Sequence, residues 1–95
     1  MRKYETLFIL KPELEEEQRN ELIEKFKSII ESDGEVENVK EWGIKKLAYE
    51  IKKYKEGYYV LINFKAGAEL PKELERNFRI SDDVIRYLVV NLEEK

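Results

Sequence analysis

The spacing of apolar residues switches between two periods along this chain of 95 residues, and the order of those switches most constrains its fold. Alternation with a period of two predicts strands, whereas spacings of three and four predict amphipathic helices. The first pattern is found over residues 3–10, 36–52, 57–65 and 84–92. The second is found over residues 13–33 and 71–78. The chain is therefore predicted to run strand, helix, strand, strand, helix, strand.

This order of elements predicts an α+β fold of the ferredoxin-like type, βαββαβ, with a four-stranded antiparallel sheet. Right-handed crossovers place both helices on one face of such a sheet. The short lysine-rich turn KKYKEG, residues 52–57, predicts that the second and third strands form a hairpin. No internal linker or repeat interrupts the pattern, so residues 1–95 are expected to form a single domain.

Two glycines are expected to shape the backbone. Gly34 follows the first helix in the stretch SDG, where it is predicted to close the helix in the left-handed conformation. Gly43 interrupts the long second strand, where a bulge or a bend is expected. At the second helix, Pro71 suits the first turn, and Leu70, Leu74 and Phe78 are expected to line one side.

The first strand, KYETLFIL, carries apolar residues on both of its faces. Alternation puts Leu7 and Ile9 on the face away from the helices, where Tyr59 and Leu61 of the third strand are expected to join them. An exposed apolar patch of this kind suggests a binding surface. A shift of one residue in the strand register would swap the two faces instead, so the patch is one of two readings at this point.

Composition excludes most familiar catalytic designs. The chain has no cysteine and no histidine, which removes disulfides, thiolate metal sites and Ser-His or Cys-His nucleophile pairs. No catalytic residue, metal site or cofactor is expected. No apolar run is long enough to span a membrane and the amino terminus lacks the features of a signal peptide, so a cytoplasmic location is expected. The net charge of -3 means that nucleic acid could be bound only through a local basic patch.

The stretch EGYYVLINFK, residues 56–65, invites comparison with RNA-recognition domains, which stack bases on exposed aromatic rings of a central strand. Those domains have a basic residue before the glycine, whereas Glu56 precedes Gly57 here. Val60, Ile62 and Asn63 also occupy positions where aromatic or small residues are expected. The stretch is therefore predicted to be mainly a core strand.

Basic residues are scattered over the chain, and phosphate binding needs several of them to converge. Any one of them could equally be a solvated residue that balances nearby glutamates, above all Lys52, Lys53 and Lys55. The acidic run ELEEEQRNELIE is typical of a solvated helix face, where carboxylates complement the helix dipole and need no ligand. Trp42 could anchor a partner or cover one end of the core.

Three separated segments together resemble one family, the bacterial small-subunit ribosomal protein six. RKYE at residues 2–5 resembles its amino terminus, EWGIKKLAYEI at residues 41–51 resembles its central signature, and FRISDDVIRYLVV at residues 78–90 resembles its last segment. The resemblance covers essentially the whole chain. Two departures are visible: Glu50 replaces the usual proline, and Ile44 and Lys45 occupy a stretch that is often richer in arginine.

The resemblance implies a structural component of the small subunit that binds the central domain of 16S rRNA together with small-subunit ribosomal protein eighteen during assembly. It implies neither enzymatic activity nor a small-molecule substrate. Carried over onto matching positions, the RNA-facing residues are Arg2, Lys3, Tyr4, Lys45, Lys46, Arg79 and Arg86. The residues expected to pack against the protein partner are Trp42, Tyr49, Tyr59 and Leu61.

Two other functions use the same topology. An acylphosphatase-type enzyme needs a phosphate-cradling loop after the first strand, where this chain has the acidic stretch KPELEEE. A small-molecule regulatory or dimerisation domain could use the sheet for self-association and ligand capture, and it stays open as the alternative. The fold alone does not choose among these functions.

Overall fold

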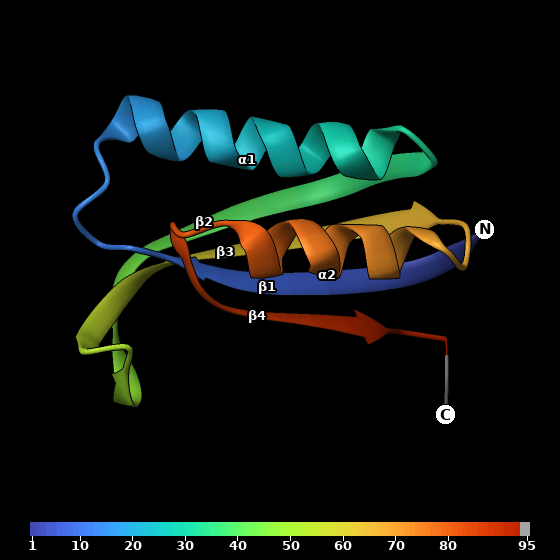
Figure 1. The fold of residues 1–95 in the computed structure, drawn as a ribbon. Coiled ribbons are helices and arrows are strands. Elements are labelled where there is room, and N and C mark those ends of the chain that lie inside the picture. Colours follow the sequence, from blue (N-terminus) through green and yellow to red (C-terminus); the bar gives the residue numbers. More distant parts are fainter. Residues whose placement is uncertain (94–95) are drawn as a thin grey trace.

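A computed structural model describes residues 1–93 and confirms the ferredoxin-like α+β fold (Figure 1). The elements follow in the order β1 (Arg2–Leu10), α1 (Glu16–Glu31), β2 (Gly34–Ile51), β3 (Tyr54–Ala66), α2 (Leu70–Ile80) and β4 (Val84–Asn91). The strands form one antiparallel sheet in the order β2-β3-β1-β4. Both helices cover the same face of this sheet (Figure 1). The other face, which we call the open face, has no helix over it.

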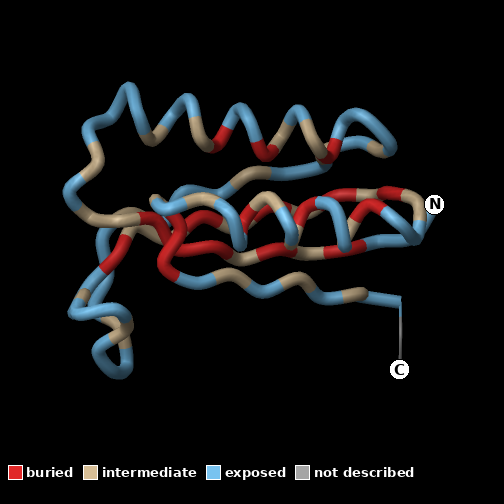
Figure 2. Tube along the Cα trace, in the orientation of Figure 1, coloured by how far each residue is buried: buried red, intermediate tan, exposed pale blue. Residues whose placement is uncertain are grey.

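The core lies between the sheet and the two helices, as the alternation in β1 predicts. Phe8 of β1, Phe26 of α1 and Phe78 of α2 are fully or almost fully buried and meet with ring centroids 4.5–5.2 Å apart. Thr6 points to the same side, and its buried hydroxyl donates a hydrogen bond to the carbonyl oxygen of Leu88 (2.9 Å). Figure 2 shows that buried segments follow the strands and the inner sides of the helices. The predicted register is therefore correct, and the one-residue shift is excluded.

Helix α1 begins at Glu16, three residues later than predicted. The backbone N–H of Glu15, at the cap position, donates a hydrogen bond to Gln18 Oε1 (3.1 Å). Glu16 and Glu17 then fill the first turn, where carboxylates interact favourably with the positive end of the helix dipole. Cap chemistry thus fixes the start of the helix.

The prediction for Gly34 was wrong in its physical reason. Gly43 is the only glycine among residues 1–93 with a positive φ, so Gly34 does not close α1 in the left-handed conformation. Gly34 is instead the first residue of β2, where a Cβ atom would collide with the carbonyl oxygen of Lys65. Glycine is needed here for the close approach of two backbones.

Gly43 is a bulge, as predicted. Its φ is 82°, and the pairing of β2 with β3 shifts register between Glu41 and Gly43, which leaves Trp42 as the extra residue. A second shift occurs between Val36 and Asn38. β2 is therefore an irregular strand whose direction changes along its length.

The hairpin turn is much shorter than the predicted six residues. β2 continues to Ile51 and β3 begins at Tyr54, so only Lys52 and Lys53 form the turn. Both have positive φ values, 51° and 71°, as the favoured two-residue hairpin turns require. Such turns usually contain Asn or Gly, and the absence of those residues concealed this one.

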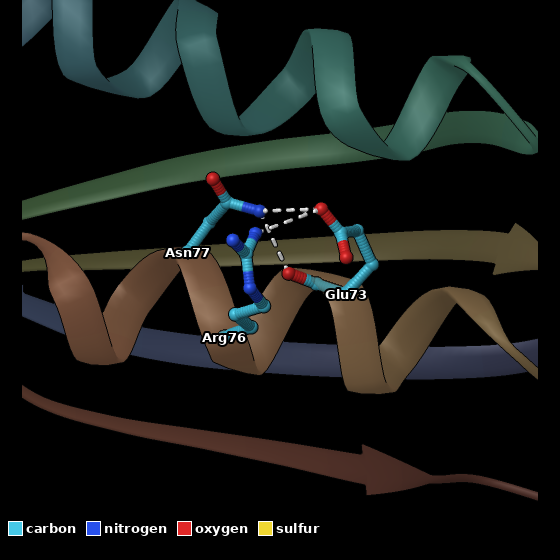
Figure 3. Close-up of polar contacts among 3 residues, drawn as sticks. All are labelled: Glu73, Arg76 and Asn77. Atoms are coloured by element: carbon cyan, nitrogen blue, oxygen red, sulfur yellow. Dashed lines mark hydrogen bonds and ion pairs between the residues drawn. The ribbon is translucent and has the colours of Figure 1, made fainter.

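The exposed side of α2 is occupied by contacts within the helix (Figure 3). Asn77 Nδ2 donates hydrogen bonds to the carbonyl oxygen of Glu73 (2.8 Å) and to its Oε1 (3.1 Å). Arg76 Nη1 also lies 3.5 Å from Glu73 Oε1. Arg76 is thus neutralised locally, as expected for a solvated helix face.

Candidate interaction surface

The open face carries a continuous row of apolar residues across three strands. Leu7 of β1 pairs with Leu61 of β3 on one side and with Leu88 of β4 on the other. In the next row towards the hairpin, Ile9 lies between Tyr59 and Arg86. The expected patch therefore exists.

The far end of the β2–β3 hairpin bends towards this open face. Figure 1 shows it extending from the sheet on the side away from the helices. Between this hairpin end and the open face lies a cavity of about 230 Å³, which we call the hairpin groove. Its lining residues come from all four strands and are Leu7, Ile9, Leu47, Ala48, Tyr49, Ile51, Tyr59, Arg86, Tyr87 and Leu88.

A small apolar cluster packs around Ile9, which lines the hairpin groove. Ile9 and Ile85 are each 5% exposed, although neither belongs to the core under the helices. Ile85 is buried where β4 shifts register against β1, between the pairs Ile9–Arg86 and Leu10–Val84. Both isoleucines lie beside Gly57, where a Cβ atom would collide with Ile9 Cγ2. The hairpin is therefore supported by a second, smaller apolar cluster.

Arg86 and Tyr49 meet at the rim of the groove. Arg86 Nη1 donates a hydrogen bond to the Tyr49 hydroxyl (2.7 Å), and its Cζ lies 5.9 Å from the centre of the Tyr49 ring. The two residues are 37 positions apart in the chain. The sequence assigned Arg86 to RNA and Tyr49 to a protein partner, whereas the structure joins them in one feature.

The other basic residues that were predicted to face RNA lie at two opposite ends of the sheet. Lys45 and Lys46 are exposed on the hairpin, and Lys45 Nζ lies 5.1 Å from the centre of the Trp42 ring. Arg2 and Lys3 are exposed at the start of β1, and Arg2 lies seven residues before the Ile9–Arg86 pair. At roughly 3.3–3.4 Å per residue, that separation is about 24 Å.

Arg79 is exposed in the last turn of α2. The loop that follows α2 lies against the end of β1, because the Lys11 backbone N–H donates a hydrogen bond to the Asp83 carbonyl oxygen (3.0 Å). Arg79 therefore belongs to the same end of the sheet as Arg86. Since Arg2 and Lys3 lie at the opposite end, the predicted RNA-facing residues do not converge on one patch.

Tyr4 is the exception among the predicted RNA-facing residues, because it lies in the core. It is 5% exposed, and its ring stacks on Phe64 with centroids 5.5 Å apart. It shares the helix-covered side of β1 with Phe8. Its ring is thus not part of the exposed surface.

Several surface residues escaped the analysis of the sequence. Leu88 and Val90 of β4 are 56% and 39% exposed. The alternation of VIRYLVVN indicates their exposure, because one face of the strand carries Arg86, Leu88 and Val90 and the other carries Tyr87 and Val89. The patch predicted from the sequence included residues of the first and third strands only, so these residues of the last strand were missed. Leu47 and Ile51 were missed because the bend of the hairpin depends on tertiary structure.

The helix-covered side of the hairpin base holds a polar network around Tyr58. Its hydroxyl donates to Glu41 Oε1 (2.8 Å), and Arg19 Cζ lies 4.1 Å from the ring centre. Burial raises the pKa of Tyr58, and the hydrogen bond to Glu41 raises it further. A similar bond from the Tyr54 hydroxyl to Glu13 Oε1 (2.6 Å) raises the pKa of Tyr54.

Across residues 1–93, no group of three or more histidine, cysteine, aspartate or glutamate side chains is arranged to hold a metal ion. No helix in the same part of the chain has the length and hydropathy needed to cross a membrane.

Comparison with known proteins agrees with the fold and with the motifs. A family model described as Ribosomal protein S6 matches residues 3–91. The small ribosomal subunit protein bS6 of Clostridium novyi is 64% identical over 95 residues, which cover 99% of this chain and all of that protein. The bS6 protein of Alkaliphilus oremlandii is 57% identical over 94 residues, with 99% and 100% coverage.

A solved structure is also closely similar. The crystal structure of 30S ribosomal protein S6 from Thermotoga maritima superposes with a TM-score of 0.90 at 39% identity, over 95% of this chain and 86% of that one. The family is one of structural ribosomal proteins and not of enzymes. This chain belongs to the ribosomal protein S6 family of the small ribosomal subunit.

Proposed function

We propose that this chain binds the central domain of 16S rRNA together with small-subunit ribosomal protein eighteen during assembly of the small subunit. Membership of the family makes it a component of the cytoplasmic ribosome that partners with rRNA. In this proposal, residues 1–95 act as a single domain. The observation that carries the proposal is the open face, an apolar surface that extends over three strands and has no helix over it.

The protein partner contacts the open face and the hairpin. Tyr49, Tyr59 and Leu61 lie on this surface or at its edge, and Trp42 projects from the bulge with 45% of its surface exposed. Aromatic residues are enriched at the centres of protein interfaces because they bury a large area with few rotatable bonds. Burial of Leu88 and Val90 would add to this contact area.

The RNA is contacted through cations at both ends of the sheet. Lys45, Lys46 and Arg79 lie at the hairpin end, and Arg2 and Lys3 lie at the opposite end. Because the chain carries a net charge of -3, these few cations bind RNA weakly alone. A basic protein partner on the open face completes the cationic surface, so the pair binds more tightly than either protein.

The test is binding to a central-domain fragment of 16S rRNA across a salt series, with and without protein eighteen. Binding is expected to tighten when the partner is present and to weaken as the salt concentration rises. In the K45A/K46A variant, the slope of log affinity against log salt should fall by up to about two, one for each phosphate contact. The matched control is K25A/K72A, which removes two exposed lysines from the helices.

The same binding measurements can contradict the proposed function. If neither the chain nor the pair binds the rRNA fragment, the proposal is wrong. A stable homodimer in sedimentation with ligand-induced stabilisation would then favour the alternative, a regulatory or dimerisation domain.

A further inference from the structure

The size of the hairpin groove limits what can enter it. Sites for cofactors and drug-sized ligands usually measure about 300–1,000 Å³. The groove measures about 230 Å³, and its walls include Leu7, Ile9, Leu47 and Leu88. This volume and these walls fit one apolar side chain better than they fit a free cofactor.

The charge of the groove also limits which chemical groups can occupy it. Arg86 is the only charged residue in its lining, which contains no carboxylate. The Arg86 guanidinium gives one hydrogen bond to the Tyr49 hydroxyl and takes part in none of the ion pairs formed by residues 1–93. A guanidinium has five N–H donors in a planar fork that matches a carboxylate. An uncompensated cation beside apolar walls therefore favours an occupant with a carboxylate next to an apolar group.

RNA matches this surface less well than protein does. A phosphate could pair with Arg86, but the sugar-phosphate backbone has no apolar side chain to fill the space between Ile9 and Leu47. The exposed lysines Lys45 and Lys46 lie on the same hairpin, outside the lining of the groove, where phosphates can reach them. The groove and the lysines thus suit different partners.

We propose that the hairpin groove receives one apolar side chain of a protein partner, and that an adjacent carboxylate of that partner forms an ion pair with Arg86. This inference rests on the proposed function and deepens it, because it states the chemistry that the partner must present. It also moves Arg86 from the RNA-facing set to the protein interface. Tyr49 holds the guanidinium at the groove rim.

A pair of small probes tests the groove without any partner. N-acetyl-leucine, which has a free carboxylate at pH 7, and N-acetyl-leucinamide, which has none, are titrated into the ¹⁵N-labelled chain. Backbone shifts are expected at residues 47–51, 59 and 86–88. The carboxylate probe should bind at least about threefold more tightly than the amide probe. The expected ratio is small because solvent screens a charge-assisted hydrogen bond at an exposed arginine. In Arg86→Met this preference should vanish, whereas Arg79→Met, which removes an exposed arginine elsewhere, should keep it.

Three results would overturn the inference: equal affinities of the two probes, shifts confined to residues outside the groove, or an unchanged preference in Arg86→Met. Correct folding of the variant is checked by its remaining amide shifts. Because Arg86 is exposed, its replacement by methionine leaves the core untouched.

A second measurement separates this inference from the proposed function. Association with purified protein eighteen in the absence of RNA should weaken roughly tenfold in Arg86→Met and stay unchanged in Arg79→Met. If both variants bind protein eighteen and rRNA alike, the groove inference is wrong and the proposed function stands. If the wild-type chain binds neither molecule but keeps the probe preference, the proposed function fails and the groove serves another protein.

Discussion

Gly57 lies so close to Ile9 that a Cβ atom on the glycine would overlap Ile9 Cγ2. This contact joins β3 to β1 on the open face, outside the core that the helices cover. It also places Ile85 against the same glycine. The absence of one side chain thus allows Ile9, which lines the hairpin groove, and Ile85 to pack against the same glycine.

Gly57→Ala is therefore expected to destabilise the fold by about 1–3 kcal/mol, the usual cost of overpacking a tight site. Chemical denaturation measures this change. In the double variant Gly57→Ala with Ile9→Ala, the clash is gone, so the total cost should be smaller than the sum of the two single costs. Additive costs would show that the glycine and the isoleucine do not interact.

The two-residue turn offers a stabilising change. Lys52 and Lys53 both have positive φ values, which cost non-glycine residues free energy. Lys53→Gly should raise the free energy of unfolding by up to about 1 kcal/mol, because glycine adopts this conformation without steric cost. Lys55→Gly is the matched control: it lies in β3, where glycine should weaken the strand. Destabilisation by Lys53→Gly would contradict the turn geometry.

Removal of the Tyr49 hydroxyl should loosen the hairpin end without unfolding the protein. Tyr49→Phe keeps the ring and loses the acceptor of the hydrogen bond from Arg86. Hydrogen exchange of amides in residues 47–51 should quicken, while the free energy of unfolding falls by less than about 1 kcal/mol. Asn77→Ala, which removes hydrogen bonds to Glu73 on α2, serves as the control and should leave exchange in that segment unchanged.

Alkaline pH should destabilise the fold partly through Tyr58. Its pKa in the folded state is raised above the ordinary value of 10.0, so its contribution to stability is complete below pH 10. That contribution is lost as the pH rises from 10 through the folded-state pKa. Tyr58→Phe cannot ionise, so its unfolding free energy should fall less than that of the wild type between pH 9 and pH 11.5. Since the lysines titrate in both proteins, the difference between the two curves isolates Tyr58, and parallel curves would refute this assignment.

The sequence predicts the fold well where periodicity decides the structure. The alternation in β1 correctly separates Phe8 from Leu7, because one face of that strand is fully covered by helices. The spacing of Leu70, Leu74 and Phe78 predicts the buried side of α2 for the same reason. For these residues, spacing along the chain is enough to identify the buried side, and tertiary packing agrees with it.

Prediction fails where distant segments determine the local structure. The role of Gly34 depends on how closely Lys65 approaches, which no neighbouring residue reveals. The pairing of Arg86 with Tyr49 depends on the bend of the hairpin over the sheet. The family motifs included both Arg86 and Tyr49. They assigned the two residues to different partners, because a motif does not state how far apart two side chains lie. Their roles on the ribosome remain predictions.

The irregular pairing of β2 has a consequence for solubility. β2 lies at one edge of the sheet, where unpaired backbone groups along 18 residues could template the addition of a strand from another molecule. Bulges at Val36–Asn38 and at Glu41–Gly43 break that edge into short pieces that do not present a flat row of donors and acceptors. The same distortion that aims Trp42 outwards therefore protects the chain against edge-to-edge aggregation before it reaches its partners.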